Sequence, residues 1–279
     1  MAQVVADFRH PDGGVSMFND CGLYFAYSPD DCLTAYQHIR GYKITAQQHI
    51  SLKASGYFGL RNNLDLILID CAELAPQYLP AHGHGDALAF EWTVEGQRVF
   101  VDAGVYEYNP GNKRDYSRST TSHNTVNLDG IDQSEFWKAF RVGRRARITK
   151  CEYIRTPKGF QLTGAHNGYT RLDGSPTHHR HFDVTVDQIS INDQISGGHG
   201  QLAQAVLLLH PSAHVEKIAA KRIKIITGNA TVEVTASDAI SIEKASWHPD
   251  QGMDLQTLKL VIHYGTAPCK GSLILKKLT

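Results

Sequence analysis

Three ionisable side chains alternate with glycine in the segment AHGHGDALAFEW, residues 81–92. His82, His84 and Asp86 occupy every second position, so in an extended backbone they would project from the same side of the chain. The intervening glycines permit unusual dihedral angles and let a ligand or another backbone approach closely. The pattern favours a functional site; the alternative is that one or two of the histidines are hydrogen-bonded core or edge residues.

Two further polar residues stand at the ends of apolar segments, Asp102 in VFVDAG and His123 in TSHNTV. With His84 they make two imidazoles and one carboxylate, a common zinc ligand set that leaves the fourth position to water or substrate. In a straight hairpin, Asp102 would lie opposite residues 89–90, about 20 Å of strand from His84. We therefore expect a shared zinc ion only if the glycines fold His84 back. Taken singly, Asp102 is equally typical of a turn and His123 of a solvent-facing strand end.

A long polar segment, residues 105–122, lies between these two positions and carries several arginines and tyrosines. Long ordered loops of this kind are often functional. Arg114, Tyr116 and Arg118 offer donors suited to a carboxylate or a sulfate. Tyr108 is available to stack on a sugar ring or to transfer a proton. We predict Arg114, Tyr116 and Arg118 as substrate-binding residues, the alternative being that they are solvated loop side chains.

Short apolar segments recur every 8 to 15 residues from about Tyr57 onward, with Gly, Asn and Asp between them. This spacing predicts antiparallel strands. The expected strands lie within 64–70, 87–94, 98–104, 123–130, 182–192, 205–210, 224–234 and 258–265. Turn signals support three hairpins, at Glu95-Gly96, Asp187-Gln188 and Gly228-Asn229. We expect an all-β fold, a large antiparallel two-sheet β-sandwich.

The first 50 residues have a different character. The segment DDCLTAYQHIRGYKITAQQHI, residues 30–50, is polar, weakly periodic and without strand alternation, which suits a helix or an extended arm. We place a boundary near Ser51. It divides the chain into a short N-terminal helical or extended segment, residues 1–50, and a β-sandwich, residues 51–279.

Composition restricts the partners of the chain. Lysines plus arginines equal the acidic residues at 28 each, so no overall field attracts a polyanion such as nucleic acid. Five scattered cysteines without a CxxC pair predict free thiols rather than a thiolate zinc site. No segment reaches the length of a membrane span. The compartment stays open, periplasmic or secreted if a signal peptide precedes this sequence.

The stretch PAHGHGDALAFEWTVEGQRVFVDAGVYEYNPGNKRDYSRSTTSHNTVNLDGIDQSEF, residues 80–136, resembles the signature of the heparinase II/III-like domain of heparin, heparan sulfate and alginate lyases. The order, the spacing and the HGHGD and RSTTSHNTV elements all match. The resemblance continues through HPDGGVSMFND (10–20), SGYFGLR (55–61), GAHNGYTRL (164–172) and HHRHF (178–182). It covers most of the chain and implies that a helical toroid precedes the sandwich, with the catalytic cleft between the two.

The resemblance also implies roles for individual residues. His82 would point into the cleft, where it neutralises a uronate carboxylate or moves a proton. His84, Asp102 and His123 would hold one zinc ion that braces the site, with a structural role. Tyr108 resembles a substrate-contacting tyrosine of alginate-active relatives, although its loop is shorter here. On this basis we assign His82 and Tyr108 as the catalytic residues.

The implied reaction is β-elimination on a uronic-acid-containing polysaccharide. Family members take their main catalytic tyrosine, and an asparagine or histidine, from the toroid, which residues 1–50 cannot encode. We therefore expect a C-terminal fragment that is inactive by itself and has two partners, an acidic polysaccharide and the helical toroid domain. The alternative is a non-catalytic carbohydrate-binding or scaffolding sandwich with a structural metal. A zinc-water hydrolase is less favoured, because no carboxylate stands out as its general base.

Overall fold

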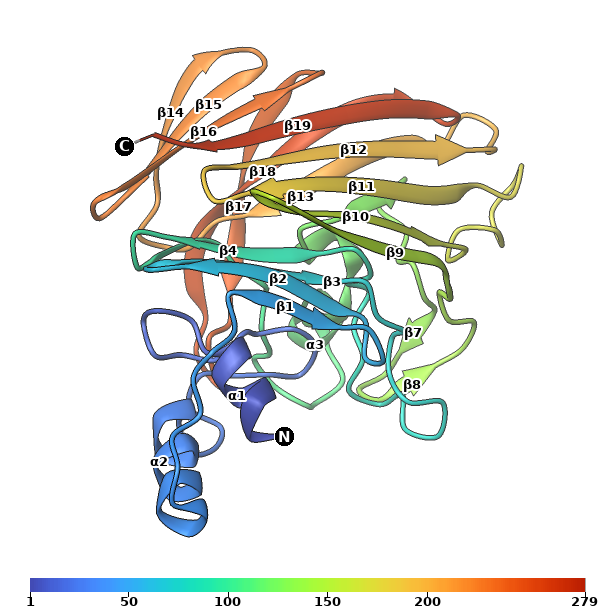
Figure 1. The fold of residues 1–279 in the computed structure, drawn as a ribbon. Helices are drawn as coiled ribbons and strands as arrows, with labels where there is room; N and C mark the ends of the chain where they lie inside the picture. Colours follow the sequence, from blue (N-terminus) through green and yellow to red (C-terminus); the bar gives the residue numbers. More distant parts are fainter. Residues whose placement is uncertain (279) are drawn as a thin grey trace.

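The computed structural model describes residues 1–278, which form an antiparallel β-fold with short helices (Figure 1). The five-stranded sheet contains, in order, β1 (His49–Leu52), β2 (Tyr57–Asn62), β3 (Asp65–Asp70), β4 (Phe90–Val94) and β5 (Gln97–Phe100). The eight-stranded sheet runs β14 (His214–Ala219), β15 (Arg222–Thr227), β16 (Ala230–Ala236), β19 (Cys269–Lys277), β12 (Gln188–Ser196), β11 (Thr177–Thr185), β10 (Gly159–His166) and β9 (Ile148–Thr156). The four-stranded sheet runs β17 (Ile240–Trp247), β18 (Leu255–Thr266), β13 (Leu202–Leu208) and β6 (Val126–Leu128), and β7 (Phe136–Trp137) and β8 (Arg141–Val142) form a separate hairpin.

These sheets make two layers around one core. An antiparallel bridge between Phe100 and Leu209 joins the five-stranded to the four-stranded sheet, and the eight-stranded sheet packs across them (Figure 1). One continuous cluster of buried apolar side chains takes members from all three sheets, among them Trp92, Phe160 and Leu207. Burial of each such side chain contributes about 1.5 to 3 kcal/mol. The predicted antiparallel β-sandwich is confirmed.

The predicted hairpins also form, for local reasons. Glu95 and Gly96 connect β4 to β5 with φ angles of 49° and 77°, and a tight hairpin turn with two positive φ angles matches the right-handed twist of its strands. Asp187 lies in the turn from β11 to β12, and Gly228, at φ 56°, in the turn from β15 to β16. Side chains in these strands alternate between the two faces of the sheet, so apolar residues at every second position point inward. In β12, for example, every second residue is buried.

The N-terminal segment contains two helices, α1 (Ala2–Phe8) and α2 (Pro29–Arg40). Ser28 and Asp31 form a capping box at the start of α2, which satisfies backbone donors that a helix leaves unpaired. Between the helices the chain lies against the five-stranded sheet, where His10 contacts Glu91 at 3.0 Å with both side chains buried. The predicted helical or extended segment is therefore present and packs on the sandwich. Strand β1 begins at His49, two residues before the expected boundary.

Two expected elements differ from the prediction. Strand β4 begins only at Phe90, because residues 81–89 form turns in which Ala89 N–H donates to the Asp86 carbonyl at 2.9 Å and Leu88 adopts φ 64°. The polar segment 105–122 is not a simple loop. It contains the helix α3 (Asn112–Arg118) and the 3₁₀ turn η1 (Thr120–Ser122).

Candidate functional site

The glycine-rich segment 81–89 is folded back against the end of α3. The N–H of Gly85 donates to the Arg118 carbonyl at 2.9 Å. A Cβ at this glycine would lie 2.4 Å from the Thr120 hydroxyl oxygen, so the close approach excludes any side chain. The segment is therefore not extended, and the side chains on either side of Gly85 are brought to the start of the segment that carries His123.

This fold-back places a compact group of possible metal ligands in the interior. Ligand atoms of His84, Asp86 and His123 all lie within 4.8 Å of one another, and all three residues are buried. Asp102 is adjacent, because its Oδ2 lies 2.8 Å from His123 Nδ1. Of the predicted ligand set, the structure thus brings His84 and His123 together and places Asp102 against His123. The sequence prediction did not include Asp86 among the ligands, although its position two residues after His84 in HGHGD could have indicated it.

Two imidazole nitrogens in this group have no hydrogen-bond partner within residues 1–278. They are Nδ1 of His84 and Nε2 of His123, whose rings lie 5.4 Å apart between centroids. A buried polar atom without a partner costs about 1 to 3 kcal/mol. Imidazole nitrogens and carboxylate oxygens are the ligands that zinc prefers outside thiolate sites. The unpaired nitrogens and the neighbouring carboxylates therefore fit a zinc ion.

Outer carboxylates hold both imidazoles by their other nitrogens. Burial lowers the pKa of His84, against the hydrogen bond to Asp20. Burial also opposes protonation of His123, but the charge and hydrogen bond of Asp102 outweigh it and raise the pKa of His123. Burial raises the pKa of Asp86. Carboxylate–imidazole pairs of this kind fix ring orientation around metal ions in proteins.

Asp20 joins this group to the proposed catalytic histidine. Its carboxylate lies 2.8 Å from both His82 Nδ1 and His84 Nε2, and it also accepts from the guanidinium of Arg114. Burial opposes the charge on Asp20, but the hydrogen bonds from His84 and Arg114 lower the pKa of its carboxyl far below the ordinary value. Sequence reasoning did not identify Asp20, and its position at the end of the HPDGGVSMFND stretch was the only signal.

His82 lies at the exposed end of the site. Its side chain is 52% exposed, and its ring contacts those of Tyr108 and Phe140 at centroid distances of 5.7 Å each. Since Nδ1 is held by Asp20, Nε2 is the atom available to a ligand. Burial raises the pKa of Tyr108, so its hydroxyl keeps its proton at neutral pH. The two residues predicted as catalytic are therefore brought together.

The sequence matches a family model described as heparinase II/III-like, C-terminal, over residues 45–273. That match covers most of the chain. The chain belongs to the heparinase II/III-like C-terminal family. No curated protein matches the sequence significantly.

Solved structures agree with this family at the level of fold. A heparinase III structure is 16% identical with a TM-score of 0.79, and it aligns over 99% of this chain and 48% of its own. Heparan sulfate lyase HepC from Pedobacter heparinus is 15% identical with a TM-score of 0.77, over 97% of this chain and 45% of its own. This chain therefore spans less than half the length of the heparinases it resembles.

In this heparinase II/III-like domain, the predicted substrate-binding side chains are largely internal. Arg114 and Arg118 are buried, and they donate to the carbonyls that flank His82, those of Ala81 at 3.4 Å and Gly83 at 3.3 Å. The Tyr116 hydroxyl donates to the Ser246 carbonyl at 2.7 Å. The two arginines thus hold the backbone around His82, whereas Tyr116 binds the backbone of β17, and direct contact of these three residues with substrate stays a prediction.

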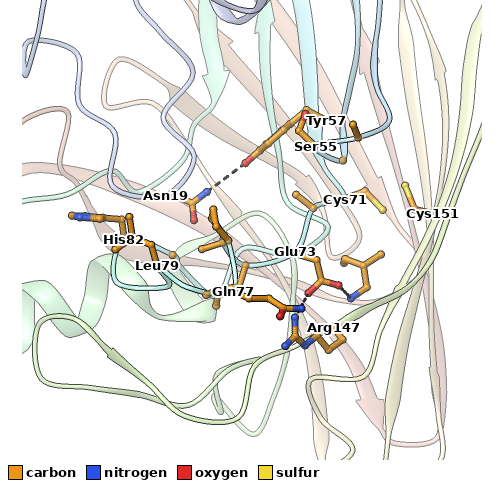
Figure 2. Close-up of a pocket in the computed structure, with 18 of the residues that line it drawn as sticks. Asn19, Ser55, Tyr57, Cys71, Glu73, Gln77, Leu79, His82, Arg147 and Cys151 are labelled. Carbon is orange, nitrogen blue, oxygen red and sulfur yellow. Dashed lines mark hydrogen bonds and ion pairs between the residues drawn. The ribbon is translucent and has the colours of Figure 1, made fainter. Parts of the chain in front are cut away.

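On another side, His82 borders a cavity of about 930 Å³ (Figure 2). Figure 2 shows His82 at one end of this cavity and Cys71 and Cys151 at the other. Between them lie Asn19, which donates to the Tyr57 hydroxyl at 3.4 Å, and an ion pair between Glu73 and Arg147 at 3.0 Å. His82 therefore lines one edge of a hollow large enough for a sugar unit.

Proposed function

We propose that this domain is the β-sandwich portion of a polysaccharide lyase that cleaves a uronic-acid-containing polysaccharide by β-elimination. The observation that carries the proposal is the placement of His82. The imidazole is half exposed beside Tyr108, and the buried Asp20 holds it from behind. A histidine that only supported the fold would not need to leave half of its side chain exposed while a buried carboxylate holds Nδ1.

The reaction needs one proton removed and one supplied. A base takes the proton at C5 of the uronate, the C4–O4 bond breaks as the C4–C5 double bond forms, and an acid protonates the leaving O4. Neutralising the uronate carboxylate stabilises the charge that develops at C5. In our proposal His82 Nε2 contacts the carboxylate or transfers a proton, since imidazole exchanges protons near neutral pH. The protonated Tyr108 hydroxyl lies beside it as a donor.

We further propose that one zinc ion, with a structural role, is held by His84, Asp86 and His123. Asp102, predicted as a ligand, lies at the opposite nitrogen of His123, and in this proposal it orients that imidazole instead. The unpaired His84 and His123 nitrogens and the two neighbouring carboxylates support this assignment. When bound, zinc would supply positive charge that fixes both imidazoles. A site closed by protein ligands is typical of structural zinc.

The proposed partners are an acidic polysaccharide and the helical toroid of a longer protein. One observation supports the longer protein: this chain aligns with less than half of each heparinase structure compared. A sandwich that supplies only one wall of a cleft would bind substrate weakly and leave the reacting sugar without the positioning contacts of the other wall. We therefore expect the 279-residue chain alone to have negligible eliminative activity.

The test is formation of unsaturated uronate, followed by its ultraviolet absorbance. The protein would be assayed with and without a helical toroid domain from a family member, covalently fused before residue 1, on alginate and heparan sulfate. Activity that requires the toroid and falls at least about 100-fold in His82→Ala supports the proposal. Activity unaffected by His82→Ala would overturn the role of His82. A fusion that binds oligosaccharide without cleaving it would favour the non-catalytic carbohydrate-binding alternative.

A further inference from the structure

Three rings meet at the exposed end of the site. The centroids of His82 and Tyr108, and of His82 and Phe140, lie 5.7 Å apart, and those of Tyr108 and Phe140 lie 5.5 Å apart. Each ring therefore contacts the other two, and we call this group the aromatic cluster. Its members come from three separate segments, namely the folded-back segment 81–89, the loop before α3 and the β7–β8 hairpin.

The two buried arginines that hold the backbone around His82 also hold the backbone around Phe140. The carbonyl of Ala139 accepts from Arg114 Nε at 2.9 Å and from Arg118 Nη1 at 3.2 Å. A buried guanidinium that bridges two chain segments fixes their separation, because each hydrogen bond it loses leaves a buried charge unsatisfied. The distance between the imidazole and the phenyl ring is thus set by the fold rather than by an adaptable loop.

Arg114 also lies beneath the faces of the cluster. Its guanidinium carbon is 5.2 Å from the Tyr108 centroid and 5.6 Å from the Phe140 centroid, within the range of cation–π attraction. Phe140 nevertheless stays 41% exposed. One exposed apolar side chain is ordinary by itself. The Phe140 ring is held in place, with the Arg114 guanidinium behind it and the half-exposed His82 imidazole beside it. These neighbours preorganise its exposed part for contact with a ligand.

We infer that Phe140 is a substrate-positioning residue, which forms with Tyr108 an aromatic platform for a pyranose ring of a uronate oligosaccharide next to His82. The inference rests on the proposed function and adds a residue to it. Rigid aromatic faces provide large contact area for the C–H bonds of a sugar at low entropic cost. The imidazole beside the platform then lies within reach of the carboxylate carried by the same sugar or its neighbour.

The test uses the 279-residue chain and a tetrasaccharide prepared from alginate, with cellotetraose as the neutral comparison, in calorimetric or NMR titrations. Phe140→Ala should weaken binding of the alginate tetrasaccharide roughly tenfold or more, equivalent to about 1.4 kcal/mol. Phe140→Trp should restore it. Trp137→Ala is the matched control, because Trp137 is 45% exposed on the same hairpin. It should bind like the wild-type chain, and unfolding curves should show all variants folded.

Each outcome decides the inference. Loss in Phe140→Ala with rescue by Phe140→Trp supports the platform. Unchanged binding in Phe140→Ala, equal loss in Trp137→Ala, or no binding of the alginate tetrasaccharide by the wild-type chain at millimolar concentration overturns it. The platform and the proposed function can fail separately. Phe140-dependent binding without cleavage in the toroid fusion would contradict only the lyase activity, and cleavage with an unchanged KM in Phe140→Ala would contradict only the platform.

Discussion

At the scale of single residues, the site depends on one carboxylate that serves three partners. Asp20 contacts the imidazoles of His82 and His84 and the guanidinium of Arg114. It thereby links the proposed catalytic residue, a proposed zinc ligand and the arginine beneath the aromatic cluster. Its partners are 62 to 94 residues away in the sequence, so no local pattern could reveal these contacts.

Replacement of Asp20 by asparagine should strongly destabilise the fold. The change leaves the fully buried Arg114 charge without its partner, and breaking a buried ion pair from one side typically costs about 3 to 5 kcal/mol. Denaturant unfolding of Asp20→Asn and wild type, both without metal, measures this difference. Glu135→Gln is the control, because the Glu135–Arg144 pair is exposed and its loss should change stability little. Equal effects of the two substitutions would contradict the role of Asp20.

At the scale of elements, the site is held by a strand from the opposite layer. Arg180 on β11 is buried and donates to the carbonyls of Leu88 at 3.0 Å and Asn124 at 2.8 Å. Leu88 lies two residues after Asp86, and Asn124 directly follows His123. Arg180 also pairs with Asp193 on β12 through two hydrogen bonds. The positive φ of Leu88 is thus maintained by tertiary contacts, which explains why alternation in the sequence wrongly predicted a strand from residue 87.

Two buried imidazoles and a carboxylate are linked in a row across strands β10, β11 and β12. His166 on β10 accepts from the Gly168 N–H at 3.2 Å and lies 3.2 Å from His178 on β11, which lies 2.7 Å from Asp193. If each histidine carries its proton on Nε2, every donor in this row has an acceptor. Burial lowers the pKa of His178, against its hydrogen bond to Asp193. Burial, with the neighbouring His178 and Arg180, lowers the pKa of His166 well below its ordinary value.

This arrangement predicts that acid weakens the fold. The folded pKa values of His166 and His178 lie below the unfolded value of about 6.5, so the unfolded state binds more protons once pH falls below that value. The contribution of these neutral histidines to the free energy of unfolding is fully present above pH 6.5. It decreases as the pH falls, by at most about 1.4 kcal/mol per pH unit for each histidine. Urea unfolding between pH 7.5 and pH 5, in chelator, should show a shallower dependence for His166→Gln than for wild type. Identical slopes would mean that His166 binds a proton as readily in the folded protein as in the unfolded chain.

At the scale of the whole molecule, sequence patterns were sufficient for the architecture and insufficient for the site. The regular spacing of apolar segments and turn pairs such as Glu95-Gly96 predicted the sandwich, because both signals are local. The contacts of Asp20 and the place of Phe140 depend on where distant segments meet. Two buried arginines, Arg114 and Arg118, were predicted to bind substrate because a polar sequence around them concealed their burial. Residue types suggested the zinc set of His84, Asp102 and His123, and resemblance to the family was needed to assign it.

The fold-back of residues 82–86 brings together the residues of the proposed zinc site directly behind His82. Metal content by elemental analysis of wild type, His84→Ala and Asp86→Ala tests this arrangement, with His199→Ala, an exposed histidine, as the control. We predict about one zinc ion per chain in wild type and in His199→Ala, and its loss in the other two variants. A folded wild-type chain without metal, or zinc retained in both His84→Ala and Asp86→Ala, would contradict this prediction.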